Sequence, residues 1–320
     1  MGVLKLKQLT AFLFIFFIAA GCSGLQMEDN KQNVGMLVES TINDMTWGQK
    51  GYMGLLLIKD QLNKDVFFEE NVRSQLDVNQ QVQSFAEKHV GLIFGHGSIY
   101  GRYFLDIHKA YPDTHFVYFN GNQYGSNMTS LNFDSHPMGF FAGMTAAEMS
   151  ETGHVGVIAA HEWQPEVGGF YEGAKYVDPD IQVHFQYVYD WNDENRALEL
   201  YDIMKEQQVD VFYPAGDGYS VPVIEKIKED GLYAIGFVTD QYELAPEAVL
   251  TSTVQHVDRL YLLAAQMYQD GNLPAGILSF GFQDGVISMG TYSEEIPEMT
   301  KRKIEDAVND YIETGRLPNE

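Results

Sequence analysis

Short apolar runs alternate with amphipathic stretches along most of this chain of 320 residues. The amphipathic stretches include residues 79–88 and 196–208. Nearly continuous apolar runs of this length are typical of parallel strands that are buried on both faces and separated by helices. The pattern therefore predicts an α/β fold of doubly wound parallel sheets. The apolar runs are residues 34–38, 66–68, 90–94, 116–119, 155–160, 209–213, 233–238 and 249–253.

A polar break at residues 150–153 divides these runs into two series, which predicts two lobes. We expect a helix at residues 258–269 to return to the first lobe, and a carboxyl-terminal helix at residues 298–314 to cover the second. The predicted division is 33–150 with 254–276 for the first lobe, and 151–253 with 277–320 for the second.

The amino-terminal residues form an export signal. Lys5 and Lys7 precede an apolar run that is too short for an ordinary membrane-spanning helix. Small residues then lead to Cys22, the only cysteine, in an arrangement that resembles the lipobox of bacterial lipoproteins. We expect residues 1–21 to be a lipoprotein signal peptide and residues 22–32 to be a flexible tether. Cys22 would then carry a lipid anchor at the extracytoplasmic face of the cell membrane. The alternative is a plain cleaved signal peptide with a chance cysteine.

The chain is strongly acidic, with 45 Asp and Glu against 20 Lys and Arg and a formal net charge of −25. Such a surface repels the phosphate backbone of nucleic acids, so we expect no direct binding to DNA or RNA. A single cysteine gives neither a disulfide framework nor a zinc site built from cysteines. Apolar residues make up 45% of the chain, which is enough for a large buried core.

All three tryptophans of the chain, Trp47, Trp163 and Trp191, follow predicted strands. In open parallel sheets, ligands bind beyond the carboxyl ends of the strands. Indole faces can stack on a flat ligand while neighbouring carboxylates and amides bind its polar edge. Any one of these tryptophans could be core packing or a loop plug, but three of three in strand-end loops favour a binding site. The expected polar residues of this site are Asp44, Asn120, Asp217 and Asp240.

No motif in the sequence specifies catalysis. A GxxxxGK[ST] phosphate loop, a GxGxxG motif after the first strand and a GxSxG nucleophile elbow are all missing. His161-Glu162 lacks the second histidine of the HExxH zinc motif, and the nine histidines show no ligand spacing. We therefore expect no enzyme, no cofactor and no metal ion. The competing hypothesis, an enzyme that acts on nucleosides, would be tested by a turnover assay.

Six segments, which keep their order and span residues 34 to about 290, match a known pattern. The first is Asp44-Met-Thr-Trp-Gly-Gln-Lys-Gly-Tyr-Met-Gly-Leu55, and the others are Phe140-Phe-Ala-Gly143, Phe170-Tyr-Glu-Gly-Ala-Lys175, Tyr189-Asp-Trp-Asn-Asp193, Ile235-Gly-Phe-Val-Thr-Asp-Gln241 and Thr251-Ser-Thr-Val-Gln255. Together they resemble the basic-membrane-protein family of substrate-binding lipoproteins, which includes nucleoside-binding members. The resemblance implies a type I periplasmic-binding-protein fold, with two Rossmann-like lobes joined by three crossovers.

The resemblance also implies which residues line the cleft between the lobes. Trp47 and Trp191 stand at the positions of the family's two stacking phenylalanines. Three polar positions differ, because Gly48 replaces an Asn, Val238 replaces an Asp and Gln255 replaces a Lys. In nucleoside-binding members these residue types hold the base and the ribose by charge-assisted hydrogen bonds. We expect Val238 and Gln255 to line the cleft, and the ligand to be a small planar, nucleoside-like molecule with fewer ribose contacts.

Two roles remain open on this resemblance. The leading hypothesis is a substrate-binding protein that delivers its ligand to the permease of an ABC transporter. The alternative is a regulatory lipoprotein of the same family, described as a positive activator of competence gene expression, which would act indirectly and without transport. The segments that favour the alternative are residues 41–44, 138–147, 163–167, 213–219 and 236–241.

Overall fold

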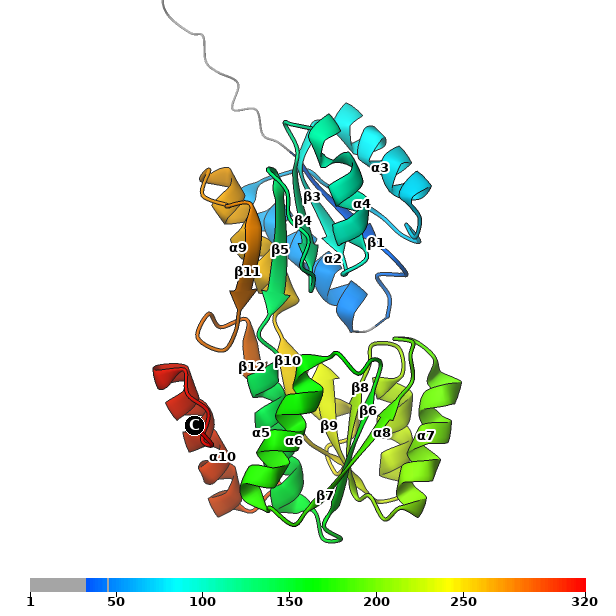
Figure 1. Ribbon diagram of the computed structural model, residues 1–320, viewed down its shortest axis with the longest axis vertical. Helices are drawn as coiled ribbons and strands as arrows, with labels where there is room; N and C mark the ends of the chain where they lie inside the picture. Colours follow the sequence, from blue (N-terminus) through cyan, green and yellow to red (C-terminus); the bar gives the residue numbers. More distant parts are fainter. Residues whose placement is uncertain (1–32, 45) are drawn as a thin grey trace, which may run out of the picture. The chain divides into compact units, whose positions relative to one another are not determined.

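The computed structural model describes residues 33–44 and 46–320. The predicted signal peptide, the expected lipid attachment at Cys22 and the tether lie outside the described residues. Within the described part, the chain forms two six-stranded sheets with helices between the strands (Figure 1). The predicted α/β class with two doubly wound sheets is confirmed.

The first lobe is built on a sheet in which every neighbouring pair of strands is parallel. Its strands are β1 (Asn33–Val38), β2 (Val66–Glu69), β3 (Val90–His96), β4 (His115–Phe119), β5 (Met128–Phe133) and β11 (Gly276–Phe280), in the order β11-β5-β4-β3-β1-β2. Its helices are α2 (Trp47–Leu62), α3 (Gln75–Glu87), α4 (Tyr100–Ile107) and α9 (Val257–Gln269). Every residue of β3 is buried. Burial on both faces explains why the sequence of this strand is almost continuously apolar.

The second lobe repeats this plan with one antiparallel edge. Its strands are β6 (His154–Ala159), β7 (Gln182–Tyr187), β8 (Val211–Ala215), β9 (Tyr233–Val238), β10 (Val249–Gln255) and β12 (Ile287–Met289), in the order β12-β10-β9-β8-β6-β7. Only β12 runs antiparallel to its neighbour among the described strand pairs. Its helices are α5 (His136–Met149), α6 (Pro165–Val177), α7 (Glu194–Glu206), α8 (Ser220–Glu229) and α10 (Glu298–Thr314). The buried faces of α5 and α6 cover one side of the sheet, and those of α7 and α8 cover the other.

The chain crosses between the two sheets after β5, after β10 and after β11. After β5 it enters α5, which packs against α6, β8 and β10 of the second lobe. After β10 it enters α9, which packs against α2 of the first lobe. After β11 it reaches β12, and α10 then packs against α5. The helices expected at residues 258–269 and 298–314 are therefore α9 and α10.

Two of the boundaries drawn from the sequence differ from the observed crossings. The first crossing lies at residues 134–135 instead of near 150, because α5 belongs to the second lobe. Ten residues of α5 are buried, and its helix has no polar face that would mark it as a surface element. The polar residues at 150–153 mark only the loop between α5 and β6. The first sheet also extends past residue 276, since β11 pairs with β5 up to Phe280.

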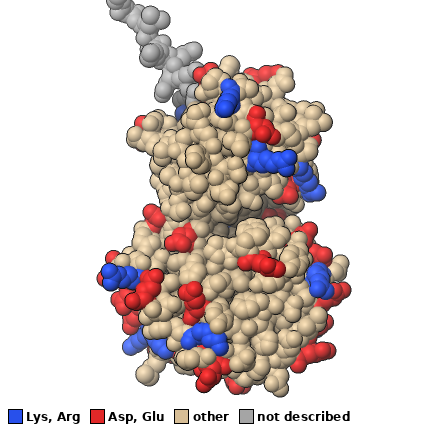
Figure 2. All heavy atoms as spheres, in the orientation of Figure 1, with Lys and Arg blue, Asp and Glu red and all other residues tan. Residues whose placement is uncertain are grey.

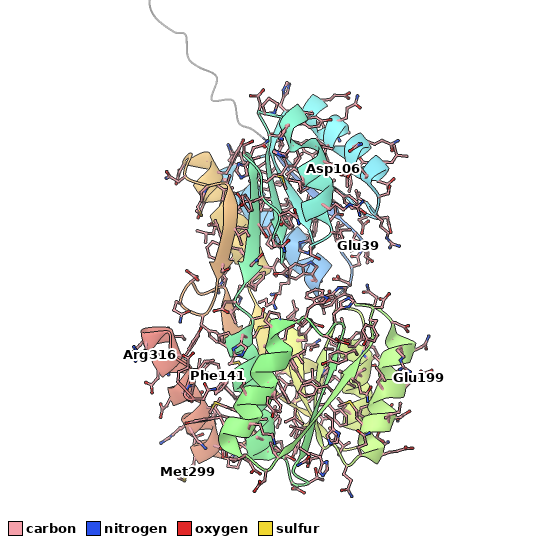
Figure 3. The ribbon with its side chains drawn as sticks, viewed as in Figure 1. Glu39, Asp106, Phe141, Glu199, Met299 and Arg316 are labelled. Carbon is pink, nitrogen blue, oxygen red and sulfur yellow. The ribbon has the colours of Figure 1, made fainter. Side chains whose placement is uncertain are left out.

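An aromatic cluster joins α5 to α10 and to the last crossing. Phe141 points from α5 toward α10 (Figure 3). Its ring lies 5.8 Å from that of Tyr311 and 5.7 Å from that of Phe282, measured between centroids, and both contacts are edge-to-face. Such contacts add to the burial of large apolar side chains. They fix the carboxyl-terminal helix against the second lobe.

Glycines allow α5 and α6 to approach each other closely. Gly139 and Gly143 of α5 face Gly169 and Gly173 of α6, and a Cβ atom at any of the four would overlap backbone atoms of the opposite helix. At Gly173, for example, it would overlap the carbonyl oxygen of Phe140. The contact therefore requires residues without side chains.

We predict that Gly173→Ala destabilises the protein by about 1–3 kcal/mol, because the methyl group cannot be accommodated without a shift of one helix. The matched control is Gly168→Ala in the same helix, where the new Cβ would meet only His136 Cδ2, at 3.9 Å. Alanine favours helix more than glycine does, so this control should be neutral or more stable by up to about 1 kcal/mol. Urea unfolding monitored by circular dichroism measures the free energy of unfolding of both variants. Equal stability of the two variants would contradict the proposed close contact.

Candidate functional site

Loops at the carboxyl ends of strands from both lobes meet. The hydroxyl of Thr46, in the loop after β1, donates a hydrogen bond of 3.0 Å to the backbone carbonyl oxygen of Asp217, in the loop after β8. Thr46 is fully buried, so this contact is shielded from solvent. The predicted site residues Trp163 and Trp191 lie in the corresponding loops after β6 and β7. The strand-end loops thus bring residues from distant parts of the sequence together.

Asp44 fixes the start of α2. Its Oδ1 atom accepts hydrogen bonds from the backbone N–H groups of Thr46 (3.1 Å) and Gln49 (3.0 Å), and its Oδ2 atom accepts one from Gly48 (2.7 Å). These bonds satisfy N–H groups that have no partner inside the helix, and the negative charge opposes the positive end of the helix dipole. The structure therefore gives Asp44 a positioning role. Its expected contact with a ligand stays a prediction.

Gly48 has a structural reason to replace the family's asparagine. A Cβ atom at this position would overlap the backbone carbonyl oxygen of Thr41 and lie 2.8 Å from Oδ2 of Asp44. Any side chain would therefore push the loop away from the helix. The change removes a polar group and at the same time permits the tight turn around Asp44.

Trp47, the first residue of α2, is held by aromatic neighbours of the first lobe. Its ring stacks on His96 with centroids 4.6 Å apart and an angle of 16° between the planes. The rings of Phe119 and Phe133 contact it edge-on at 5.7 and 6.0 Å. The half-buried indole also packs against core residues of both lobes. Trp47 is therefore a rigid part of the boundary between the lobes.

His96 stacks on one face of the Trp47 ring, and its own side chain is buried. Its Nε2 atom lies 2.8 Å from the backbone carbonyl oxygen of Trp47, so this nitrogen carries the proton and donates it. Its Nδ1 atom then accepts the hydroxyl proton of Tyr261 at 2.9 Å. Burial lowers the pKa of His96 to about 4, although the bond to Trp47 and the charge of Asp44 act in the opposite direction. The imidazole is therefore neutral at neutral pH.

A second aromatic group lies in the strand-end loops of the second lobe. Trp163 is 59% exposed and stacks on His161, with centroids 5.1 Å apart and an angle of 12°. The half-buried Trp191 meets both rings edge-on, at 5.9 Å from Trp163 and 5.4 Å from His161. No ring contact joins Trp47 to Trp191 among the residues that the structure describes. Their stacking on opposite sides of one ligand therefore stays a prediction.

Asp217 lies near two other carboxyl groups, those of Asp44 and Glu166. Burial raises the pKa of Asp217 well above its usual range, and the charges of Asp44 and Glu166 raise it further. Glu166 is buried, and burial raises its pKa even though Gln164 Nε2 donates a hydrogen bond of 2.9 Å to it. Within residues 33–44 and 46–320, no ion pair links any of the three to Lys or Arg. Burial therefore favours the neutral, protonated forms of Asp217 and Glu166.

Asp240 is engaged in holding a loop. Its Oδ2 atom accepts hydrogen bonds from the backbone N–H (2.9 Å) and the hydroxyl (2.7 Å) of Thr291, and its Oδ1 atom accepts one from the hydroxyl of Ser252 (3.3 Å). These bonds tie the end of β9 to the segment after β12. The exposed side chain thus has a structural role, and its expected contact with a ligand stays a prediction.

Val238 and Gln255 end β9 and β10, and both are buried. Val238 has a φ angle of +64°, in the left-handed region that β-branched residues rarely adopt. Strain of this kind costs about 1–3 kcal/mol and is found most often at functional sites. The Nε2 atom of Gln255 lies 3.9 Å from the sulfur of Met138. Neither position presents the charge that the family pattern has there.

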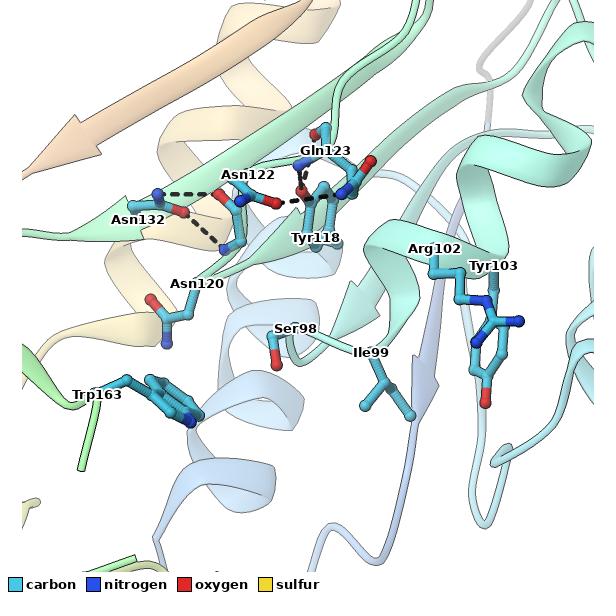
Figure 4. Close-up of a pocket in the computed structure, with 11 residues that line it drawn as sticks. Ser98, Ile99, Arg102, Tyr103, Tyr118, Asn120, Asn122, Gln123, Asn132 and Trp163 are labelled. Carbon is cyan, nitrogen blue, oxygen red and sulfur yellow. Dashed lines mark hydrogen bonds between the residues drawn. The ribbon is translucent and has the colours of Figure 1, made fainter. Parts of the chain in front are cut away.

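An open pocket of about 630 Å³ lies at the carboxyl ends of β3, β4 and β5 (Figure 4). Its wall combines residues of the first lobe with Trp163 of the second, whose ring lies beside Asn120 and opposite Ser98. Asn120 has a φ angle of +56°, and its Oδ1 atom accepts a hydrogen bond of 3.4 Å from Phe133 N–H. The lining residues are Ser98, Ile99, Arg102, Tyr103, Tyr118, Asn120, Gly121, Asn122, Gln123, Asn132 and Trp163.

The pocket contains residues that the sequence prediction missed. Ser98 and Asn122 belong to the glycine-containing turns after β3 and β4, so the position of those turns could have identified them. Asn132 could not be found in this way, because β5 was not predicted as a strand. Its amide Nδ2 donates to the carbonyl oxygen of Gly121, and its Oδ1 accepts from Gly121 N–H, both at 3.0 Å. Asn132 therefore shapes the turn that carries Asn122.

Comparison with known families identifies the chain. The family model for Bmp, described as ABC transporter substrate-binding protein PnrA-like, matches residues 31–320. The chain belongs to this family. The resemblance inferred from the sequence is confirmed, and so is the implied two-lobed periplasmic-binding-protein fold.

Three similar proteins cover most of the chain. The transcriptional activator protein med of Bacillus subtilis (strain 168) is 44% identical over 313 residues, which are 98% of this chain and 99% of that protein. A crystal structure of a transcriptional activator of the comK gene from Bacillus halodurans is 49% identical, with a TM-score of 0.83, and covers 89% of this chain and 99% of that one. A purine-binding protein of Brucella abortus (strain 2308) is 24% identical over 299 residues, 92% of this chain and 84% of that protein.

The described residues also limit other kinds of site. In residues 33–44 and 46–320, no three His, Cys, Asp or Glu side chains are grouped so that they could hold a metal ion. No helix in that same part of the chain has the length and apolar character needed to cross a membrane. On the face visible in Figure 2, basic and acidic side chains are scattered, and the basic ones form no continuous patch.

We predict that His96 makes stability fall as the pH falls from about 6.5 toward 4. In this range the unfolded chain binds a proton at this histidine while the folded protein, with its pKa of about 4, does not. The loss between pH 7 and pH 5 from this group alone is about 2 kcal/mol. A His96→Phe variant should show a smaller difference between urea unfolding at pH 7 and at pH 5.

The control for this experiment is His89→Asn, on an exposed turn where His89 has a φ angle of +54° that asparagine tolerates. This variant should keep the pH dependence of the wild type. If His96→Phe keeps it as well, the assignment of a buried neutral imidazole is wrong.

Proposed function

We propose that the protein binds a small planar ligand between its two lobes and performs no catalysis. The observation that carries this proposal is the pocket in which Trp163 of the second lobe faces the amide-rich wall of the first. An aromatic face together with a few directional polar groups is the common composition of small-molecule sites. Belonging to a substrate-binding family supports the same reading.

The ligand that fits this composition is flat, uncharged, and rich in hydrogen-bond donors and acceptors along its edge. Trp163 offers an exposed indole face for stacking. Asn120 and Asn122 offer amide groups on the wall formed by the first lobe. Arg102, which also lines the pocket, opposes a cationic ligand. A purine base or nucleoside meets these requirements, and the name of the Brucella relative supports this class.

We further propose that Cys22 anchors the protein to the extracytoplasmic face of the cell membrane through a lipid. In the transport role, the protein would pass its ligand to the permease of an ABC transporter. This role is supported by the description of the family.

A regulatory role is the second candidate, and a specific observation favours it. The Bacillus subtilis relative, 44% identical over almost the whole of both chains, is named as a transcriptional activator. The protein's charge of −25 and the expected location outside the cytoplasm both argue against direct contact with DNA. The regulatory effect would therefore be indirect, through a partner that responds to the ligand-binding lobes.

We predict that Trp163→Ala weakens ligand binding by about five- to 150-fold, since stacking of a base on an aromatic ring contributes about 1–3 kcal/mol. The double variant Trp47→Ala/Trp191→Ala should abolish binding. A thermal-shift screen with purine bases and nucleosides identifies the ligand, and isothermal titration calorimetry measures its affinity for each variant.

The matched control is Met299→Ala, which truncates a side chain that is 86% exposed on α10 (Figure 3). It should bind the ligand like the wild type. If Trp163→Ala and the double variant also bind like the wild type, the site assignment is wrong. Turnover of a nucleoside by the wild type would instead contradict the absence of catalysis.

We predict that Cys22→Ala releases the protein from the membrane fraction, because the residue that would carry the lipid is gone. Fractionation of cells followed by immunoblotting measures this. The Ser23→Ala variant, changed at the next residue, is the control and should stay with the membrane. A Cys22→Ala protein that partitions like the wild type would show that the anchor is not at this cysteine.

A further inference from the structure

Two histidines face each other on the second lobe, near the amino-terminal ends of β6 and β7. The Nδ1 atom of His154 lies 2.9 Å from the Nε2 atom of His184. The rings are nearly parallel, with an angle of 24° and centroids 5.2 Å apart. The two strands are parallel neighbours, and Gly156, two residues after His154, pairs with His184. The pair lies at the opposite end of these strands from Trp163 and is separate from the pocket.

The contact between the two rings needs one donor and one acceptor, because it joins two imidazole nitrogens. One of the two facing nitrogens therefore already directs a free lone pair at the other. Neutral imidazole with a free lone pair is a common ligand of transition metals in proteins.

The surrounding charges also favour a cation. Gln207, whose side chain acts on His184, is the C-cap residue of α7, and the carboxyl end of a helix carries a partial negative charge. Lys205, the basic residue in that last turn, pairs with Asp230 at 2.7 Å. The positive charge closest in sequence is therefore neutralised by its own partner.

We propose that His154 and His184 form a binding site for a divalent transition-metal ion of the Cu²⁺ or Zn²⁺ type. Two metal–nitrogen bonds of about 2.0–2.1 Å, at angles between octahedral and tetrahedral, place the nitrogens about 2.9–3.4 Å apart. The observed separation of 2.9 Å lies at the short end of this range. The distance between the nitrogens is therefore compatible with one shared ion, and the rings need to turn so that both lone pairs converge on it.

Binding of the ion need not release a proton. One of the two facing nitrogens already has a free lone pair, and the other holds the shared proton. When the ion binds, this proton moves to the second nitrogen of its own ring, so both imidazoles stay neutral and each offers a lone pair. Water molecules complete the coordination, because no third His, Cys, Asp or Glu is placed to do so among the described residues. Two imidazole ligands bind Cu²⁺ more tightly than Zn²⁺.

Titration of the full chain with CuSO₄ and with ZnCl₂ at pH 7.5 tests this site. The wild type should bind one equivalent of each ion at the pair, Cu²⁺ more tightly. His154→Asn and His184→Asn should each weaken this binding at least tenfold. The control His89→Asn, on an exposed turn, should bind like the wild type. Copper electron paramagnetic resonance should show hyperfine coupling to two imidazole nitrogens, which disappears in both pair variants.

Lowering the pH to 5 should remove the ion, because protonated imidazole has no lone pair to offer. Binding that is equally tight in His154→Asn and His184→Asn, or the lack of any equimolar binding by the wild type, overturns the proposal. In that case the contact between His154 and His184 is only a hydrogen bond between their imidazoles. None of these variants changes a residue that lines the pocket, so binding of a planar ligand in the pocket can be measured separately. If the pocket bound no ligand, that result would contradict the proposed function and leave the metal site untouched.

Discussion

The three passages of the chain between the lobes determine where its functional loops lie. Parallel strands end at one edge of their sheet, so each lobe collects its loops at a single edge. The crossings then bring the two edges together, and the hydrogen bond from Thr46 to the carbonyl oxygen of Asp217 joins them. The close contact of α5 with α6 follows from the same constraint. Because the first crossing leads straight into α5, this helix must be buried against the second sheet, and only glycine allows α6 to pack so closely on it.

The sequence predicted the buried strands well and the less apolar strands poorly. Strands such as β3 and β8 are buried throughout and read as continuous apolar runs. The missed strand β5 is also buried, but it contains Thr129, Ser130 and Asn132, whose side chains are satisfied by hydrogen bonds to Pro274 and Gly121. The edge strands β7 and β12 have partly exposed residues and no apolar run. The hydrogen-bond partners of the polar residues in β5, and the neighbours that an edge strand pairs with, come from other parts of the chain. The periodicity of the sequence alone therefore does not reveal these strands.

Strand-end position in the sequence points to a region of the fold but does not give the role of each residue in it. All three tryptophans lie in or beside loops of the two lobes, as their clustering in the sequence indicated. Asp44 and Asp240, however, use their carboxylates to hold backbone groups in place. Local sequence cannot separate a carboxylate that binds a ligand from one that caps a helix, since both follow strands and both are partly exposed. The strained φ angle of Val238 is likewise visible only in the structure.

Transport and regulation depend on the same physical quantity in this architecture. A ligand changes the arrangement of two lobes only as far as it binds one arrangement more tightly than the other. The Thr46–Asp217 hydrogen bond contributes about 0.5–1.5 kcal/mol to the contact between the lobes. A ligand that binds one arrangement a hundredfold more tightly than the other supplies about 2.7 kcal/mol, which outweighs this bond. Changes in the pocket would therefore impair both roles together. The transport role and the regulatory role differ only in the partner protein. In both roles this partner must recognise the outer surface of the lobes and not the cleft itself.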